Sequence, residues 1–361
     1  MSLPVGKVPV KILKNIVFRY LGAHRSDVIM GPSIGEDAAI VRVGKKVMVI
    51  SGDPVTGAVE KIGWLAVHVN ANDVASRGIR PLWFVSCILL PEHSEKNIVR
   101  KICSQIDRAA RELNVAVVRG HTEVTPGLSH PIVAGCIIGL AERGKYVTSG
   151  GAKPQDRIVL TKGAGIEGTA ILASDRRKIL NKIFGKEFTS KAEKYFNQIS
   201  VVKDALVAYH TGGVTAMHDP TEGGVACGLH ELADASNVGF RVFEDRIIVN
   251  SETKAICDFF HVDPLQLISS GALLITANPK KAENIIKTLS KNGVQSAIIG
   301  EIVKAPDERI LIRRDGTETH LPRPVTDHLW LALAKNLKKN KFKFGKRLET
   351  SSAPSRQPVY Q

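Results

Sequence analysis

Apolar positions in the first half of the chain switch between helical and strand-like spacing. Residues 10–21 place Val10, Leu13, Val17 and Leu21 on one face of a helix, so a surface helix is expected there. Further along, short apolar runs bounded by Gly, Pro or Asp predict strands, and longer amphipathic segments predict helices. Strands are expected at 38–43, 46–51, 82–90, 115–118 and 132–140, and helices at 62–76 and 95–113.

The pattern restarts after a Gly- and Pro-rich segment at 149–154, which predicts a domain boundary. Beyond it, strands are expected at 156–161, 215–218, 240–243, 272–276, 297–302 and 309–312, and helices at 168–174, 176–184, 201–209, 225–236 and 279–292. A last amphipathic helix is expected at 327–337. Alternating strands and helices indicate a mixed α and β class.

This organisation divides the chain into four parts. Residues 1–30 form an N-terminal helical segment, and residues 31–150 and 151–320 form two domains. Residues 321–361 hold the last helix and a lysine-rich tail, which is expected to be disordered because it has too little apolar surface to bury.

Composition narrows the class of protein. The chain has 361 residues and is 43% hydrophobic, enough for two cores. No apolar run approaches the ~18 residues needed to cross a bilayer, and no signal-peptide pattern opens the chain. None of the five cysteines shows C-x-x-C spacing, which argues against zinc or a disulfide framework. We therefore expect a cytoplasmic protein that does not bind a membrane.

The net charge of +15 raises the question of an anionic partner. Part of the excess lies in the tail at 335–347, where Phe342 and Phe344 alternate with lysines. Such a tail could contact phosphates and stack bases. Solvated basic tails are common, however, so nucleic acid is not the expected partner.

Two phosphate-binding motifs can be set aside. Residues 163–168 match G-x-G-x-x-G between a strand and a helix, but several helices intervene before the next expected strand at 215–218. A dinucleotide fold needs that strand within one βαβ unit, so we expect these glycines to let the helix pack closely on the strand. The chain also has no G-x-x-x-x-G-K-[ST] sequence.

Carboxylates recur where the expected elements end. They are Asp37, Asp53, Asp73, Glu123, Asp219 and Glu222. Each alone is typical of a cap or turn, but together they could converge on Mg²⁺ bound to ATP. Phosphates would then be held by metal ions, glycine-rich turns and helix N-termini. The segment 219–221 fits the last role, since it precedes the helix expected at 225–236.

The segments that carry these carboxylates resemble the aminoimidazole ribonucleotide synthetase (PurM-like) superfamily, and within it the HypE-type hydrogenase maturation proteins. The resemblance rests on Gly35–Ala39, Asp53–Val55, Val69–Pro81, Gly120–Glu123 and Asp219–Gly224. It runs in order from about residue 31 to 315 and implies an α+β, two-domain fold. It also implies that the N-terminal domains of two subunits pair into a β-barrel, and that the C-terminal domain is α/β.

The resemblance further implies an activity. ATP lies near the subunit interface and phosphorylates a carbonyl or carbamoyl oxygen, and a later step expels phosphate. By position, Asp37, Asp53, Asp73 and Asp219 hold Mg²⁺, and Asp37, His121 and Asp219 are the catalytic candidates. The nucleotide-binding candidates are Gly35, Asp53, Asn72, Asp73, Gly120, Thr122, Glu123, Thr221, Gly223 and Gly224. A histidine at 121 could act as acid or base or bond a phosphate; it could equally just order its own turn.

Departures from the HypE pattern leave the acceptor open. HypE-type proteins carry substrate on a C-terminal cysteine, whereas this sequence ends Pro358-Val359-Tyr360-Gln361, so carbamoyl chemistry on its own tail is not expected. His121 stands where HypE has aspartate; Gly-His-Thr is closer to selenophosphate synthetase, whose N-terminal Cys or Sec with a nearby Lys is absent. Thiamine-monophosphate kinase would show D-x-S-D-G-L in place of residues 219–224. We expect a HypE-like homodimer with a small-molecule or protein-borne carbonyl acceptor. The alternatives are a non-catalytic nucleotide-binding or assembly paralogue, and a selenophosphate synthetase- or thiamine-monophosphate kinase-like phosphotransferase.

Overall fold

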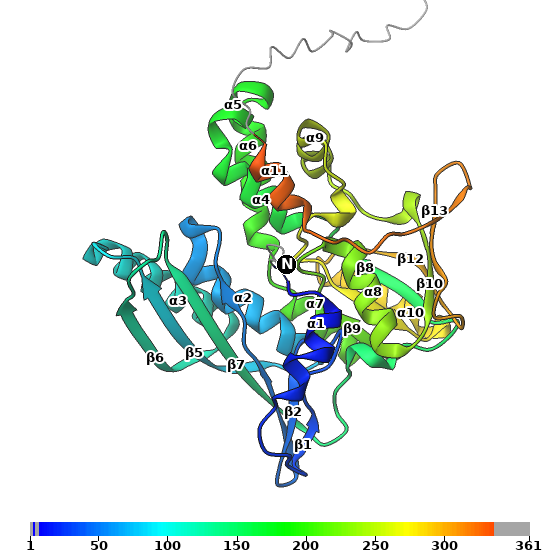
Figure 1. The fold of residues 1–361 in the computed structure, drawn as a ribbon. Coiled ribbons are helices and arrows are strands. Elements are labelled where there is room, and N and C mark those ends of the chain that lie inside the picture. Colours follow the sequence, from blue (N-terminus) through cyan, green and yellow to red (C-terminus); the bar gives the residue numbers. More distant parts are fainter. Residues whose placement is uncertain (1–2, 4–6, 336–361) are drawn as a thin grey trace, which may run out of the picture.

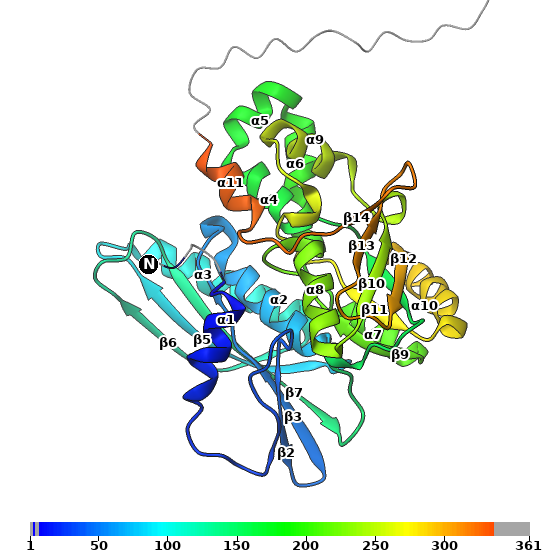
Figure 2. The same cartoon turned by 45° about the vertical axis from the view of Figure 1, so that its right-hand side comes forward.

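The structure, a computed structural model, describes residue 3 and residues 7–335. The basic tail and the last two residues of the helix expected at 327–337 lie outside this range. Two lobes, each built around a mixed sheet, meet along one side (Figures 1 and 2). None of the described helices is both long and apolar enough to cross a membrane.

The N-terminal domain is an open sheet covered on one face by two helices. Its strands, in spatial order, are β1 (Val28–Met30), β2 (Ala39–Val43), β3 (Lys46–Ser51), β7 (Ile132–Glu142), β5 (Pro81–Leu90) and β6 (Ala116–Val124). The short β4 (Pro54–Val55) also pairs with β7. Only β5 and β6 run parallel. The described sheet has two free edges, β1 and β6, and is not a closed barrel.

Helix α2 (Ile62–Ala75) lies at the centre of the molecule. Nearly every residue of α2 is buried, as expected for a helix with apolar residues around its whole circumference. It packs against β7, against α3 (Lys96–Leu113) and against α7 (Val202–Thr211) of the other domain. The larger apolar cluster accordingly contains residues of both domains, such as Val74 and Ile199. One hydrophobic core therefore extends across the domain junction.

The C-terminal domain is a seven-stranded sheet with helices around it. Its strands, in spatial order, are β14 (Glu318–His320), β13 (Arg309–Ile312), β10 (Gly239–Phe243), β12 (Ser296–Val303), β8 (Arg157–Thr161), β11 (Leu274–Ala277) and β9 (Val214–His218). Besides α7, the helices are α4 (Ile166–Asp175), α5 (Arg177–Phe184), α6 (Lys186–Glu193), α8 (Gly224–Ser236), α9 (Ser251–Phe260), α10 (Pro279–Lys291) and α11 (His328–Ala334). Helices α4, α5, α6, α9 and α11 form a group of their own at the top of Figure 1.

Several expected elements differ from the structure. The strand expected at 115–118 extends further than predicted: β6 continues to Val124, and all nine of its residues are exposed. Parallel pairing with β5 carries the strand through the Gly-His-Thr-Glu sequence, whose polar composition is typical of a turn. The expected helix at 10–21 is split into α1 (Val10–Asn15) and a 3₁₀ turn. Helices α6 and α9 and strands β1 and β14 were not predicted.

Candidate active site at the domain junction

The loop before β2 brings Asp37 to the junction between the domains. Gly35 in this loop has φ of +77°, and a Cβ there would lie 2.3 Å from the carbonyl oxygen of Glu231 on α8. Only glycine allows both the left-handed backbone and this approach. The glycine therefore presses the loop against α8 of the other domain and fixes where Asp37 lies.

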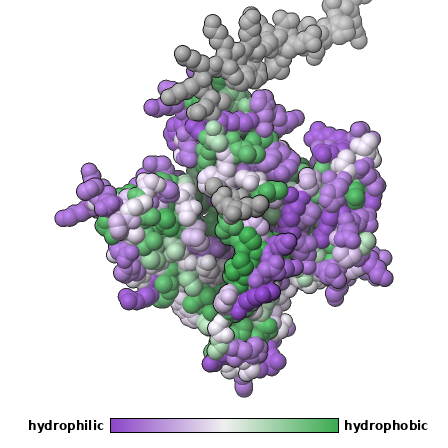
Figure 3. All heavy atoms as spheres, in the orientation of Figure 1, coloured by the Kyte–Doolittle hydropathy of each residue, from purple (hydrophilic) through white to green (hydrophobic). Residues whose placement is uncertain are grey.

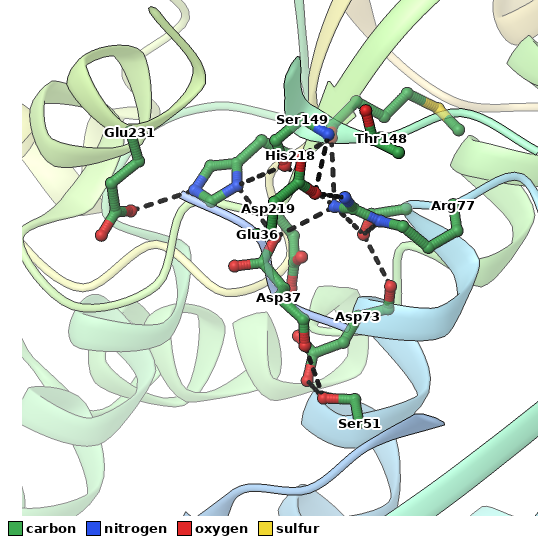
Figure 4. A network of polar contacts seen from close by, with 12 residues as sticks. Glu36, Asp37, Ser51, Asp73, Arg77, Thr148, Ser149, His218, Asp219 and Glu231 are labelled. Carbon is green, nitrogen blue, oxygen red and sulfur yellow. Dashed lines mark hydrogen bonds and ion pairs between the residues drawn. The ribbon is translucent and has the colours of Figure 1, made fainter. Parts of the chain in front are cut away.

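Asp37 is held by a histidine and an arginine (Figure 4). His218 Nδ1 lies 2.9 Å from Asp37 Oδ2, and its Nε2 lies 3.0 Å from Glu231 Oε2. Although burial disfavours a charged ring, the carboxylates of Asp37 and Glu231 raise the pKa of His218 to about 10. His218 is therefore an imidazolium at neutral pH and donates a hydrogen bond to each carboxylate.

Arg77 joins the same network from the end of α2. Its guanidinium is fully buried and donates to Glu36, to Asp37 Oδ2 at 3.1 Å and to Ser149 Oγ at 3.0 Å. Glu36 in turn accepts from the backbone N–H groups of Ser149 and Gly150, at 3.1 and 3.0 Å. These bonds attach the start of the second domain to the loop that carries Asp37.

Asp73 lies below Asp37 in Figure 4, beside Ser51. The Ser51 hydroxyl oxygen is 2.6 Å from Asp73 Oδ2 and 2.8 Å from the carbonyl oxygen of Asp37. The Ser51 hydroxyl donates to Asp73, and this bond favours the ionised carboxylate. Burial, together with the charges of Asp219, Asp53 and Asp37, raises the pKa of Asp73 well above its ordinary value. The bond from Ser51 therefore offsets only part of the burial and charge repulsion that act on Asp73.

Asp219 is the most unusual carboxylate of the group. It is 1% exposed, and neither of its oxygens has a hydrogen-bond partner among the residues the structure describes. Burial and the nearby charge of Asp37 raise the pKa of Asp219 to about 8. Buried polar groups are rarely left unpaired, so these two oxygens point to a missing partner.

Asp53 connects the group to a cavity. Asn70 fixes the backbone on both sides of this residue, accepting from its N–H at 2.8 Å and donating to its carbonyl at 3.1 Å. The pKa of Asp53 is raised by burial and by Asp37, and Lys7 opposes this shift. Asp53 lines a cavity of about 310 Å³ between the domains, and the other polar lining residues include Lys7, Glu167, Thr221, Glu222 and Ser270. Among the lining residues Lys7 is the only basic one.

These residues fit a magnesium-bound polyphosphate. Within residues 7–335, no group of three or more His, Cys, Asp or Glu side chains is arranged to hold a metal ion by itself. Mg²⁺ in nucleotide sites is bound by one or two carboxylates together with phosphates and water. A bound cation would pair with the free oxygens of Asp219. Its charge would also oppose the burial and carboxylate repulsion that raise the pKa values of Asp73 and Asp219.

Other predicted residues lie elsewhere. Gly120, His121, Thr122 and Glu123 are on β6, where His121 is exposed and its Nε2 lies 2.9 Å from Glu123 Oε2. Strands β5 and β7 separate β6 from β4, which follows Asp53, so roughly 14 Å of sheet lies between them. Within one subunit, the structure does not bring the 120–123 segment to the carboxylates.

The remaining predicted nucleotide-binding residues lie at the domain junction, in the cavity wall and at the start of α8. The Asn72 amide donates to Ile199 O at 2.9 Å and accepts from Val201 N–H at 2.8 Å, so it joins the domains. Thr221 lines the cavity. Gly223 and Gly224 begin α8, but the Gly223 N–H donates to Asp327 Oδ2 at 2.6 Å. A carboxylate of the chain itself thus occupies the helix N-terminus expected to hold phosphate.

Sequence reasoning missed Glu36, Arg77, His218, Glu231 and Glu167. The first three adjoin predicted residues: Glu36 precedes Asp37, Arg77 lies in the 69–81 block, and His218 precedes Asp219. Their position next to predicted site residues was the sequence signal that could have identified them. Glu231 and Glu167 sit within helices and carry no comparable sequence mark.

Comparison with known proteins identifies the family. The N-terminal domain model of AIR synthase related proteins matches residues 35–141, and the C-terminal domain model matches residues 153–313. A hydrogenase expression/formation protein of Methanocaldococcus jannaschii is 28% identical over 306 residues, which is 83% of this chain and 89% of that protein. The carbamoyl dehydratase HypE of Azotobacter vinelandii is 31% identical over 249 residues, or 67% of this chain and 70% of its own length.

Solved structures agree on the fold. HypE in a HypE–HypF complex superposes with a TM-score of 0.72 at 22% identity, over 87% of this chain and 99% of that one. HypE in complex with ATP superposes with a TM-score of 0.69 at 23% identity, over 91% and 98%. The predicted PurM-like, two-domain fold is confirmed. The chain belongs to the AIR synthase related family and is similar within it to the HypE-type hydrogenase maturation proteins.

Proposed function

We propose that this protein uses ATP and Mg²⁺ to phosphorylate the oxygen of a carbonyl or carbamoyl group, in a HypE-like step of hydrogenase maturation. The observation that carries the proposal is Asp219, buried beside Asp37 and Asp73 with both oxygens unpaired. The relatives named carbamoyl dehydratase and the ATP-bound neighbour support the same chemistry. The D-P-T-E-G-G sequence at 219–224 favours this reading over a thiamine-monophosphate kinase-like one.

The chain's own residues would divide the work as follows. Asp219 and Asp53, with Asp37 and Asp73 beside them, would hold Mg²⁺, which when bound neutralises phosphate charge during transfer. His218 and Arg77 donate to Asp37 and keep it ionised and fixed in position, since the pKa of Asp37 is lowered by both despite its burial. No side chain needs to act as a nucleophile, because positioning and charge neutralisation supply the rate.

The test is ADP release by purified protein with ATP and Mg²⁺. We expect release that EDTA abolishes and that Asp37→Asn lowers by about tenfold or more, because a preorganised charge at the reacting phosphate is lost. Asp307→Asn, an exposed carboxylate in a distant turn, is the matched control. ATP that raises the melting temperature without ADP release would favour the non-catalytic paralogue. If the protein neither binds ATP nor releases ADP, both functions are refuted.

The acceptor is proposed to be a small molecule or a group carried by another protein. HypF accompanies HypE in one structural neighbour, and this supports a protein-borne acceptor for the present chain as well. The cytoplasmic location stays a prediction. The lysine-rich tail that could contact nucleic acid lies outside the described residues.

We further propose a homodimer that pairs through β6. All nine residues of this edge strand are exposed, among them Val117, Val118 and Val124, which are 48%, 53% and 56% exposed. In Figure 3, hydrophobic residues lie over the lobe that holds β5, β6 and β7. A long edge strand that exposes several apolar side chains is rarely left uncovered, so a second copy is the expected cover.

Val118→Glu should convert the dimer to a monomer. A charge placed in an apolar strand interface loses its hydration without gaining a partner. Light scattering after size-exclusion chromatography would report the mass of wild type and variant. Val325→Glu, at a position 90% exposed and away from β6, should remain dimeric. A monomeric wild type, or a Val118→Glu variant that stays dimeric, would contradict this interface.

A further inference from the structure

Lys7 differs from the other cations that the structure describes beside the site carboxylates. His218 uses both ring nitrogens to bond carboxylates, and the Arg77 guanidinium is fully buried among its acceptors. The Lys7 side chain, in contrast, is 51% exposed, and its ammonium lies 3.5 Å from Glu231 Oε1. Charge-assisted hydrogen bonds measure about 2.7–2.9 Å, so this contact is a loose ion pair. Such a half-exposed pair costs little to break, and Lys7 is therefore available to a stronger acceptor.

The segment that carries Lys7, residues 7–16, is attached to the domains only loosely. None of its residues is buried. The Lys7 backbone N–H donates to Glu222 Oε2 at 2.9 Å, which fixes residue 7 to the loop that follows Asp219. Beyond this point the apolar side chains of the segment line a second cavity, of about 640 Å³. Helix α1, dark blue in Figure 1, lies there in front of the junction between the lobes. The segment thus has both a tether and space to move inward.

The interdomain cavity of about 310 Å³ is acidic apart from Lys7. Its carboxylates are Asp53, Glu167 and Glu222, and Lys7 is the only basic residue in its lining. A triphosphate that enters this cavity meets negative side chains, and Mg²⁺ offsets only part of the total charge. A lysine presents a compact positive charge with three donors and is a common ligand of phosphate. Lys7 is thus the described lining residue best suited to meet a phosphate.

The charge of Lys7 already reaches the carboxylates proposed to hold Mg²⁺. Loss of hydration lowers the pKa of Lys7, but the charges of Glu231 and Asp37 outweigh this effect and raise it above its ordinary value. Lys7 is therefore an ammonium at neutral pH. In turn, it opposes the rise in the pKa of Asp53 that burial causes. A phosphate bound through Mg²⁺ to Asp53 would lie within the influence of the same positive charge.

We propose that Lys7 leaves Glu231 when Mg²⁺–ATP binds and donates hydrogen bonds to the γ-phosphate, so that residues 7–16 close over the site as a strap. The inference rests on the proposed function and names a residue that contacts the transferred group. Glu231 keeps its bond to His218 and is not left unpaired. During transfer the acceptor oxygen forms a bond to the γ-phosphorus, and the bond from that phosphorus to the β–γ bridging oxygen breaks. Lys7 gains and loses no proton; its charge stabilises the transferred phosphate.

The first measurement compares two nucleotides by calorimetric titration in the presence of Mg²⁺. Lys7→Met should weaken binding of the uncleavable ATP analogue AMPPCP by about 10- to 100-fold, because a hydrogen bond to a charged group is lost. Binding of ADP should be unchanged, because ADP has no γ-phosphate. Lys11→Met, which alters an exposed lysine on α1, should bind both nucleotides as wild type does. Equal weakening for both nucleotides would indicate a structural role and, like unchanged binding of AMPPCP, would overturn the proposal.

The second measurement follows closure of the strap by hydrogen–deuterium exchange. In wild type, AMPPCP with Mg²⁺ should slow exchange of the backbone amides of residues 8–16, whereas ADP should not. Lys7→Met should lose this response to AMPPCP, and Lys11→Met should retain it. Exchange in residues 8–16 that AMPPCP leaves unchanged in wild type would refute closure.

The third measurement is the kcat for ADP release. Lys7→Met should lower it about 100-fold, because a positive charge at the transferred phosphate is lost. Lys7→Arg should recover part of the loss, because it keeps the charge but not the compact ammonium. The melting temperature of ligand-free Lys7→Met should match that of wild type, since a loose pair adds little stability. A wild-type kcat in Lys7→Met, or no recovery in Lys7→Arg, would contradict the role.

The strap and the proposed function fail in different ways. If wild type binds neither nucleotide and releases no ADP, both fall. If wild type binds AMPPCP and releases ADP from ATP, but Lys7→Met does so equally well, the proposed function stands and only the role of Lys7 falls.

Discussion

Asp219→Asn should make the ligand-free protein more stable while abolishing its response to ATP. The carboxylate is buried with no hydrogen-bond partner among the described residues, and asparagine removes its charge without changing its size. We expect a gain of about 2 kcal/mol in the free energy of unfolding at pH 8. We also expect a ~10³-fold fall in ADP release, because a charge that neutralises the transferred phosphate is lost.

The stability gained in Asp219→Asn should depend on pH, because Asp219 titrates with a raised pKa in the folded protein. The pKa of Asp219 is about 8 in the folded protein, against 3.8 for an ordinary aspartate. The folded state therefore holds this proton more tightly, and its contribution to stability is present at low pH and is lost as pH rises toward 8. Urea unfolding followed between pH 5 and pH 8 should show a flatter profile in Asp219→Asn, with Asp307→Asn as control. A less stable variant that still binds Mg²⁺–ATP would contradict the assignment.

Arg77→Met should destabilise the protein by about 3–5 kcal/mol, since removing one partner of a buried ion pair leaves the other charges uncompensated. Arg77 is fully buried and donates to Glu36 and Asp37, as well as to Ser149 in the second domain. Urea unfolding followed by tryptophan fluorescence measures the loss. Arg77→Lys should lie in between, because an ammonium keeps the charge but cannot reproduce the planar fork.

A double variant separates charge from packing. If the cost of Arg77→Met comes from the unpaired carboxylates, adding Glu36→Gln should recover part of it, and the two changes should be non-additive. Additive losses would show instead that the guanidinium acts mainly by filling space. Wild-type stability in Arg77→Met alone would refute the network as a source of interdomain stability.

The fold was largely predictable because its elements are strongly patterned. Helix α2 has a long run rich in apolar residues, and α3 buries Ile102 and Ile106 at helical spacing, so both were predicted to within a residue or two. Strand β6 was not, because its polar, glycine-containing sequence is stabilised by pairing with β5 and not by burial. Long-range pairing of this kind leaves little trace in local composition.

The site was predictable only in part. Carboxylates at element ends pointed to Asp37, Asp73 and Asp219, which the fold brings together. One partner of Asp37 comes from the opposite domain. His218 bonds Asp37 across a separation of 181 positions, and the local sequence of neither residue indicates this contact.

The burial of α2 bears on how the two halves of the chain can vary. Asn72 bonds the backbone of Ile199 and Val201, and the core formed around α2 draws on both domains. Although each half matches its own family model, neither half could be exchanged for that of a relative without matching the surface that meets α2. The two halves match separate family models, but substitutions at their shared core must be compatible, so we expect the two domains to evolve together.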